Sequence, residues 1–164
     1  MSAQSRTSEG ETATHVVLST FRANGLLLAA GDVLTAPYGL TSARWQVLGA
    51  IALAERPLTV PQIARRMGLA RQSVHPTVKR LVRDGHLELA PNADHRRSQL
   101  VRLTETGRAK YAAVDARQAA WVNRLAAGIG RTDLVTAVRV LDQLCRRLEN
   151  DGTASREGDE GGDE

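Results

Sequence analysis

Hydrophobic residues recur at helical spacing along most of the chain. A broad apolar face over residues 15–30 predicts a well-buried first helix. Thr41 is placed as the N-cap of a second helix, with Leu40 and Trp45 positioned as a hydrophobic staple. The inner stripe of this second helix consists of Trp45, Leu48, Ile51 and Ala52.

Two short helices follow, and their ends are well marked. Thr59 and Gln62 have the spacing of a capping box. Leu58 and Ile63 form the staple pair, and Gly68 supplies a left-handed stop. The next helix, ended by a glycine, repeats apolar residues on one face: Val74, Val78, Leu81 and Val82. Two short helices joined by a tight glycine-containing turn are typical of a helix-turn-helix.

Two alternating segments then predict a β-hairpin. Leu87 and Leu89 mark the first strand, and Val101 and Leu103 mark the second. The connection, residues 91–98, is rich in turn formers and charged, so we expect a wing with a basic tip.

Two longer helices complete the pattern. Thr104 caps the first, which holds Tyr111, Val114, Trp121, Val122 and Leu125. The last helix repeats apolar residues at alternating spacings of three and four, the seam of a helix that packs on another helix: Leu134, Ala137, Leu141, Leu144 and Leu148. The predicted fold class is mainly α with a small β-hairpin wing (α+β).

Composition changes the picture at the two ends. Residues 1–13 and 150–164 are poor in apolar side chains, and we expect both to be disordered. The second end is acidic, so it either competes with DNA for a basic face or is simply a solvated end. We find no apolar run near the ~20 residues of a membrane helix and no signal peptide, and the single cysteine excludes an internal disulfide. We therefore expect a cytoplasmic protein without a membrane partner.

The net charge of +4 understates how basic part of the chain is. Residues 1–150 carry 21 basic and 12 acidic side chains, and residues 41–110 carry 13 and 5. A concentrated basic region is typical of a protein that binds a polyanion. However, 20 of the 22 basic residues are arginines, so an arginine-rich surface of compositional origin explains the charge equally well.

The outer face of the second short helix carries groups suited to reading double-stranded DNA. Arginine and lysine donate to guanine, glutamine pairs with adenine, and serine or threonine reaches bases or phosphates. An ordinary solvated helix face has similar residues, but the capped helix and glycine turn before it favour a recognition helix. The candidates are Arg71, Gln72, Ser73, His75, Thr77, Lys79 and Arg80, with Arg83 beside them.

Pro76 complicates this interpretation. If the helix begins near Arg71, Pro76 lies inside it, removes the hydrogen bond to Gln72 and kinks the axis. If Ser73 is the cap, Pro76 falls in the first turn, where its missing N–H needs no partner. We expect this late or loosened start.

The wing tip is the second candidate contact. Arg96 and Arg97 are placed to reach the adjacent minor groove or its phosphates. Asp94 would be repelled by DNA, so we assign it to ordering the wing through hydrogen bonds. A mobile charged loop is the alternative interpretation.

These residues lead to a family resemblance. Segment 94–107 resembles the wing signature of MarR-type (multiple antibiotic resistance regulator) transcription regulators, which has an Asp, then an Arg two residues on, then Leu-x-Leu-Thr-x-x-Gly. Leu103, Thr104 and Gly107 fit this pattern, and Val101 replaces the first Leu. Further segments resemble the family in matching order over residues 15–150: 40–48, 58–64, 71–74 and 81–85. Pro76 departs from the family pattern.

The resemblance implies a homodimer with residues 14–36 and 108–149 as dimerisation helices and residues 40–107 as the winged helix-turn-helix DNA-binding domain. It also implies a repressor of nearby genes on a pseudo-palindromic operator with half-sites about 10 bp apart. A small aromatic or phenolic effector would release it from a pocket between the dimer region and the winged domain. Candidate pocket residues, which are equally typical of an ordinary core, are Leu28, Trp45, Leu48 and Tyr111.

Other chemistry is less well supported by the sequence. Some relatives sense peroxides through a cysteine near the N-terminus, whereas Cys145 lies in the last helix and is expected to be a buried structural thiol. The four histidines lack metal-ligand spacing, and no nucleophile–base constellation or cofactor fingerprint occurs, so we expect no metal, no cofactor and no enzyme. A winged-helix module that binds a protein or RNA remains the alternative to a DNA-binding regulator.

Overall fold

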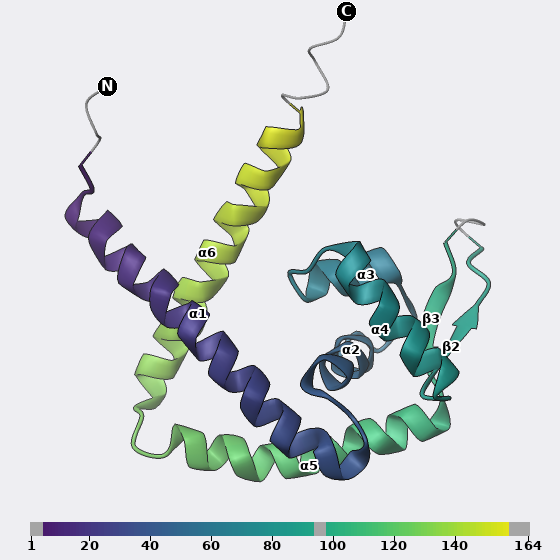
Figure 1. The fold of residues 1–164 in the computed structure, drawn as a ribbon. Helices are drawn as coiled ribbons and strands as arrows, with labels where there is room; N and C mark the ends of the chain where they lie inside the picture. The colour runs from purple at the N-terminus through teal and green to yellow at the C-terminus, as the bar shows by residue number, and fades with distance from the viewer. Residues whose placement is uncertain (1–4, 94–97, 158–164) are drawn as a thin grey trace, which may run out of the picture. The chain divides into compact units, whose positions relative to one another are not determined.

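The computed structural model describes residues 5–93 and 98–157, with side chains up to residue 151 (Figure 1). The chain divides into two compact units, Met1–Ala120 and Trp121–Glu164. The fold is mainly helical with one small antiparallel sheet, which confirms the predicted fold class.

The first unit has a regular order of elements. Its helices are α1 (Ser8–Thr35), the short 3-10 helix η1 (Ala36–Tyr38), α2 (Ser42–Ala52), α3 (Val60–Arg66), α4 (Arg71–Arg83) and the start of α5 (Glu105–Ala126). Its strands are β1 (Leu58–Thr59), β2 (Leu87–Ala90) and β3 (Leu100–Leu103), arranged in the order β1-β3-β2. We had predicted only the β2–β3 hairpin. The two-residue β1 is too short to show alternation in the sequence.

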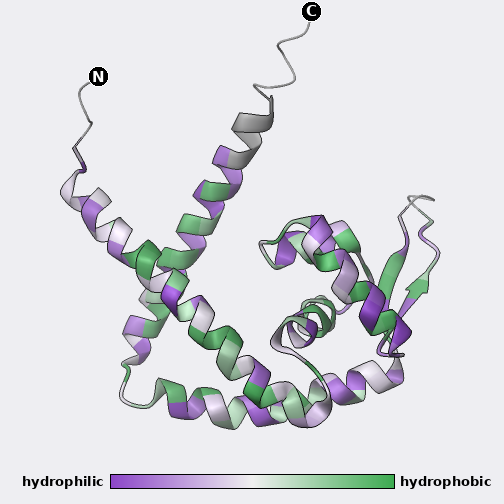
Figure 2. Ribbon diagram, viewed as in Figure 1, coloured by the Kyte–Doolittle hydropathy of each residue, from purple (hydrophilic) through white to green (hydrophobic). Residues whose placement is uncertain are grey.

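Helix α1 begins earlier than expected, at Ser8, so the prediction of disorder over residues 1–13 is wrong from that residue on. The reason is a local cap: the Thr7 side-chain oxygen accepts a 3.0 Å hydrogen bond from the Gly10 N–H. The helix is also not buried within this chain, because Phe21 is 70% exposed and Leu18 is 59% exposed. Figure 2 shows hydrophobic residues, in green, along this helix.

By length and composition alone, α1 together with η1 is apolar enough to cross a membrane, and it is the only such segment in the part of the chain that the structure describes. We had expected no such segment. A single helix of this kind near an N-terminus is weak evidence for a membrane span, because soluble helices and signal sequences pass the same test.

The predicted helix ends are confirmed in α2 and α3. The Thr41 side chain accepts from the Arg44 N–H at 3.4 Å. Thr59 and Gln62 form both hydrogen bonds of the capping box. Gly68 follows α3 with a φ of +63°, a backbone conformation that glycine adopts without strain.

The core of this unit lies between α2, α3, α4 and the sheet. Its fully buried side chains come from every one of these elements, and α5 adds Val114; the largest are Leu48, Leu58, Ile63, Leu81 and Leu87. In the hairpin, Leu87 pairs with Leu103 and Leu89 with Val101, in the register that the alternation predicts.

Thr104 joins the start of α5 to the end of α4. Its hydroxyl donates to the Gly85 carbonyl at 2.7 Å and accepts from the Gly107 N–H at 3.0 Å. The predicted N-cap is thus confirmed, and it also links the long helix to the turn before β2.

The second unit contains the end of α5 and helix α6 (Arg131–Glu157). Because α6 continues to Glu157, the prediction of disorder from residue 150 is wrong up to that residue. The seam residues Leu134, Leu141 and Leu148 are exposed within the single chain. Cys145 is exposed too, so the expectation of a buried thiol is wrong for this chain.

Candidate nucleic-acid interface

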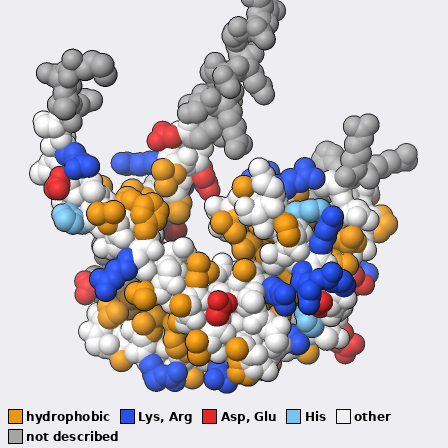
Figure 3. All heavy atoms as spheres, viewed as in Figure 1, with side chains coloured by type: hydrophobic (Ala, Val, Ile, Leu, Met, Phe, Trp, Pro, Cys, Tyr) orange, Lys and Arg blue, Asp and Glu red, His pale blue; other side chains and the backbone are white. Residues whose placement is uncertain are grey.

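Helix α4 separates an apolar inner face from a polar outer face. Val74, Val78 and Leu81 are buried, since they recur at the spacing of one helix side. Thr77 is half-buried, and the other candidate contacts are exposed: Arg71, Gln72, Ser73, His75, Lys79 and Arg80. Figure 3 shows lysine and arginine side chains gathered over this helix.

The helix starts at Arg71, so our expectation that Ser73 caps it is wrong. Ala70 is the N-cap, with no side-chain hydrogen bond, and its carbonyl accepts from Ser73 at 3.0 Å and from Val74 at 3.4 Å. The first turn is therefore partly tightened, and Pro76 lies inside the helix. Pro76 is exposed, so its ring is on the outer face near Gln72 and Lys79.

The wing residues Asp94, Arg96 and Arg97 lie outside the described residues. The strands that carry them are well defined. Glu88 and Arg102 face each other across β2 and β3 and form an ion pair of 2.8 Å. The register of β2 and β3 is therefore fixed on both sides of this connection.

A groove of about 490 Å³ separates α4 from the sheet. Arg71, His75 and Lys79 line it from the helix. Leu89 lines it from β2, and Ser98 and Gln99 line it from the segment just before β3. Three of the predicted DNA-binding residues therefore share the side of α4 that faces the wing.

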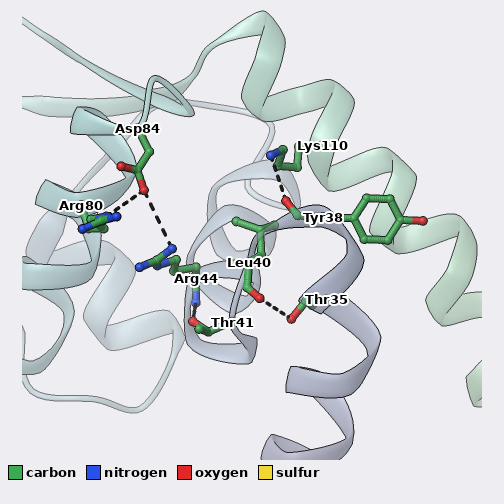
Figure 4. Close-up of polar contacts among 8 residues, drawn as sticks. All are labelled: Thr35, Tyr38, Leu40, Thr41, Arg44, Arg80, Asp84 and Lys110. Atoms are coloured by element: carbon green, nitrogen blue, oxygen red, sulfur yellow. Dashed lines mark hydrogen bonds and ion pairs between the residues drawn. The ribbon is translucent and has the colours of Figure 1, made fainter.

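The opposite side of α4 carries a cluster that the sequence analysis missed (Figure 4). Asp84, which follows α4, accepts a 2.9 Å hydrogen bond from Nε of Arg80 and lies 3.9 Å from a terminal nitrogen of Arg44 on α2. The hydrogen bond from Arg80 lowers the pKa of the Asp84 carboxyl below its usual value, with smaller contributions from Arg44 and Arg83. The spacing of four between Arg80 and Asp84 was a visible signal. The contact with Arg44 was not, because forty residues separate it from Asp84.

The four residues predicted to line an effector pocket differ in how far they are buried. Leu48 is fully buried and Leu28 is exposed, whereas Trp45 is half-buried with its indole N–H enclosed and unpartnered within the described residues. Tyr111 packs against Gly49, where a Cβ would come within 3.3 Å of its ring.

Tyr111 also lines a cavity of about 470 Å³ between α2, β3 and α5. Burial raises the pKa of its phenol, and Asp115 adds to this shift. The other lining residues combine an apolar floor with arginines: Ile51, Ala52, Glu55, Arg56, Pro57, Arg102, Leu103 and Arg108.

Metal chemistry has no obvious centre in residues 5–93 and 98–157, where no cluster of three or more His, Cys, Asp or Glu side chains occurs.

Comparison with known sequences identifies relatives. The model of the MarR family matches residues 38–98. The protein Rv2011c of Mycobacterium tuberculosis is 45% identical over 111 residues, which cover 68% of this chain and 76% of that protein. The transcriptional activatory protein BadR of Rhodopseudomonas palustris is 32% identical over 103 residues, covering 60% and 57%.

Solved structures with the same fold include two proteins that are 25% identical to this chain. The M. tuberculosis regulator MosR, crystallised with DNA, has a TM-score of 0.68 and covers 82% of this chain and 96% of its own. CouR of Rhodococcus jostii RHA1, bound to p-coumaroyl-CoA, also has a TM-score of 0.68 and covers 79% and 88%. The winged helix-turn-helix, the sequence relatives and these structures agree, and the chain belongs to the MarR family of transcription regulators, which are not enzymes.

Proposed function

We propose that the protein is a cytoplasmic repressor that binds a pseudo-palindromic operator as a homodimer. The observation that carries this proposal is the division of α4 into a buried face and an outer face of hydrogen-bond donors and cations. Such a helix fits the major groove, where arginine, lysine and glutamine discriminate bases. MosR, a structural relative, was crystallised with DNA, which supports the same partner here.

The dimer is supported by apolar residues that this chain leaves exposed on α1 and α6. A single copy of α4 reads only a few base pairs, so two copies on one operator add specificity. We assign residues 14–36 and 108–149 to dimerisation and residues 40–107 to DNA binding.

We assign effector binding to the cavity beside Tyr111. Its apolar floor suits an aromatic ring, and the guanidinium groups of Arg56 and Arg108 suit a carboxylate or phosphate. CouR binds p-coumaroyl-CoA, an aromatic acyl group joined to a phosphate-bearing carrier, which supports a ligand of this kind.

The test begins with fragments recovered from the source genome by the purified protein. A shared inverted repeat with half-sites about 10 bp apart is the expected result. Binding to that duplex should weaken steeply as salt rises, because Lys and Arg displace counterions from phosphates. Equal affinity for RNA or for unrelated duplexes would contradict the proposal.

The direction of regulation needs a separate measurement, because the relative BadR is named as an activator. A reporter gene placed behind the recovered operator should fall in expression when the protein is present. A rise would show that this chain activates.

A further inference from the structure

The cluster of Arg44, Asp84 and Arg80 joins two helices at one carboxylate (Figure 4). Arg80 comes from the outer part of α4, and Arg44 comes from the first turn of α2, outside the two helices of the helix-turn-helix. The Arg44 and Asp84 side chains are each 26% exposed, and Arg80 is 48% exposed. The three side chains are therefore partly exposed at the surface and are held to one another by the two ion pairs.

The cluster keeps an excess of positive charge. Two guanidinium groups share one carboxylate, and Arg83 adds a third cation near the same Asp84. Arg80 uses Nε on Asp84, and the other N–H donors of a guanidinium suit phosphate oxygens. An arginine held by a carboxylate is already ordered, so it loses less entropy when it binds a phosphate.

The cluster lies on one particular side of α4. Arg71, His75 and Lys79 line the groove on the side of α4 that faces the sheet. At 3.6 residues per turn, Arg80 and Asp84 fall on the other side of the exposed face, where α2 packs against α4. A helix in the major groove has a phosphate backbone on each side. The sheet lies on one flank of α4, and the Arg44–Asp84–Arg80 cluster lies on the other.

We propose that Arg44 and Arg80 together bind one backbone phosphate of the operator, on the flank of α4 away from the wing, and that Asp84 holds both guanidinium groups in place. This proposal rests on the proposed function. It moves Arg80 from base reading to phosphate binding and adds Arg44 and Asp84 to the interface.

The first test removes the cations one at a time. Arg44→Ala should weaken the full-length protein on its recovered operator and on an unrelated duplex by the same factor, roughly tenfold, and should reduce the salt slope by about 1. Arg6→Ala, at an exposed arginine before α1 and outside the segments assigned to dimerisation and DNA binding, is the control for loss of charge and should leave the affinity and the salt slope nearly unchanged. Equal effects of Arg44→Ala and Arg6→Ala would overturn the proposal.

The second test asks whether Asp84→Asn raises or lowers the affinity for DNA. Asp84→Asn makes the protein more basic, so simple attraction predicts tighter binding to DNA. If Asp84 positions the two arginines, binding should instead weaken, and this loss should disappear in the Arg44→Ala, Arg80→Ala background. Tighter binding by Asp84→Asn would overturn the proposal.

Two measurements distinguish these outcomes from unfolding of a variant and from a protein that binds no DNA at all. Thermal unfolding shows whether each variant is folded; if Arg44→Ala is not, Arg44→Lys keeps the charge but loses the planar fork and should still weaken binding. If the unmodified protein binds no duplex at all, the proposed function fails. If it binds and the Arg44 variants match the control, only this inference fails.

Discussion

His86 is a buried titratable side chain that follows α4. It is 9% exposed, and its Nδ1 has no hydrogen-bond partner within the described residues. Burial lowers the pKa of its imidazole below the usual value, and the charge of Lys110 lowers it further, against a smaller opposing effect of Asp84. The folded chain therefore binds this proton less readily than the unfolded chain does.

The consequence is a loss of stability in acid. The contribution of neutral His86 is complete above the unfolded pKa of about 6.5 and falls as the pH drops from there toward the lower pKa of the folded state. His86→Leu should remove this part of the pH dependence, which amounts to at most about 1.4 kcal/mol per pH unit. Urea unfolding of both proteins between about pH 8 and pH 5 measures it. Parallel stability curves would contradict the expectation.

Gly107 is the second residue whose role depends on packing. A Cβ there would collide with the backbone carbonyl of His86, which cannot move like the end of a flexible side chain. We expect Gly107→Ala to destabilise the protein by about 3 kcal/mol, the upper end of the usual range for substitutions that force a backbone shift. Thr106→Ala, an exposed change in the same turn, is the control and should alter the melting temperature little. Similar melting temperatures for the two variants would show that the turn adapts.

At the scale of elements, Thr104 links α5 to the end of α4. Thr104→Ala removes the donor to the Gly85 carbonyl and the acceptor for the Gly107 N–H, and should cost about 1–2 kcal/mol. Thr104→Ser keeps the hydroxyl and should retain most of the stability. Chemical denaturation of the three proteins compares them, and equal losses in both variants would assign the effect to the methyl group instead.

The elements show which parts of the fold a sequence can predict. The caps at Thr41, Thr59 and Thr104 were readable because each involves groups within three residues along the chain. The start of α4 was misplaced because Pro76 argued for a later start, whereas packing of Val74 against the core favours a helix from Arg71. Strand β1 was missed because its pairing with β3 spans about forty residues.

In the candidate site, too, features set by neighbouring residues were predictable and features set by long-range packing were not. The outer face of α4 was predicted because helical periodicity alone separates it from the core. Arg44 was missed because its partner Asp84 belongs to another helix, and only the packing of α2 on α4 brings the two together. Burial within the single chain was misjudged for α1 and Cys145, since an apolar face predicts contact without saying with which surface.

At the scale of the whole molecule, the part of the chain that the structure describes leaves many large apolar side chains exposed. Large hydrophobic side chains are exposed on α1, at the end of α5 and along α6, among them Val33, Leu125, Val138 and Leu148. A soluble monomer rarely exposes so many large apolar side chains at regular helical spacing. Burying them in an assembly would stabilise that assembly by about 25 cal/mol per Å² of apolar surface. A second copy of the same chain offers the same faces and so can cover them.

Leu141 tests the proposed dimer directly. Leu141→Asp places a charge in the apolar seam of α6 and should convert the protein to monomers or to an unstable chain, which sedimentation equilibrium and thermal unfolding distinguish. Gln143→Asp adds the same charge two residues along the helix, at an exposed polar position, and should leave the dimer intact. Because the two half-sites are bound by linked copies, the monomer should lose at least about 100-fold in operator affinity, while its affinity for a single half-site changes little. A Leu141→Asp protein that remains dimeric and binds the operator normally would show that α6 does not carry the interface, and would leave the exposed face of α1 as the surface to test next.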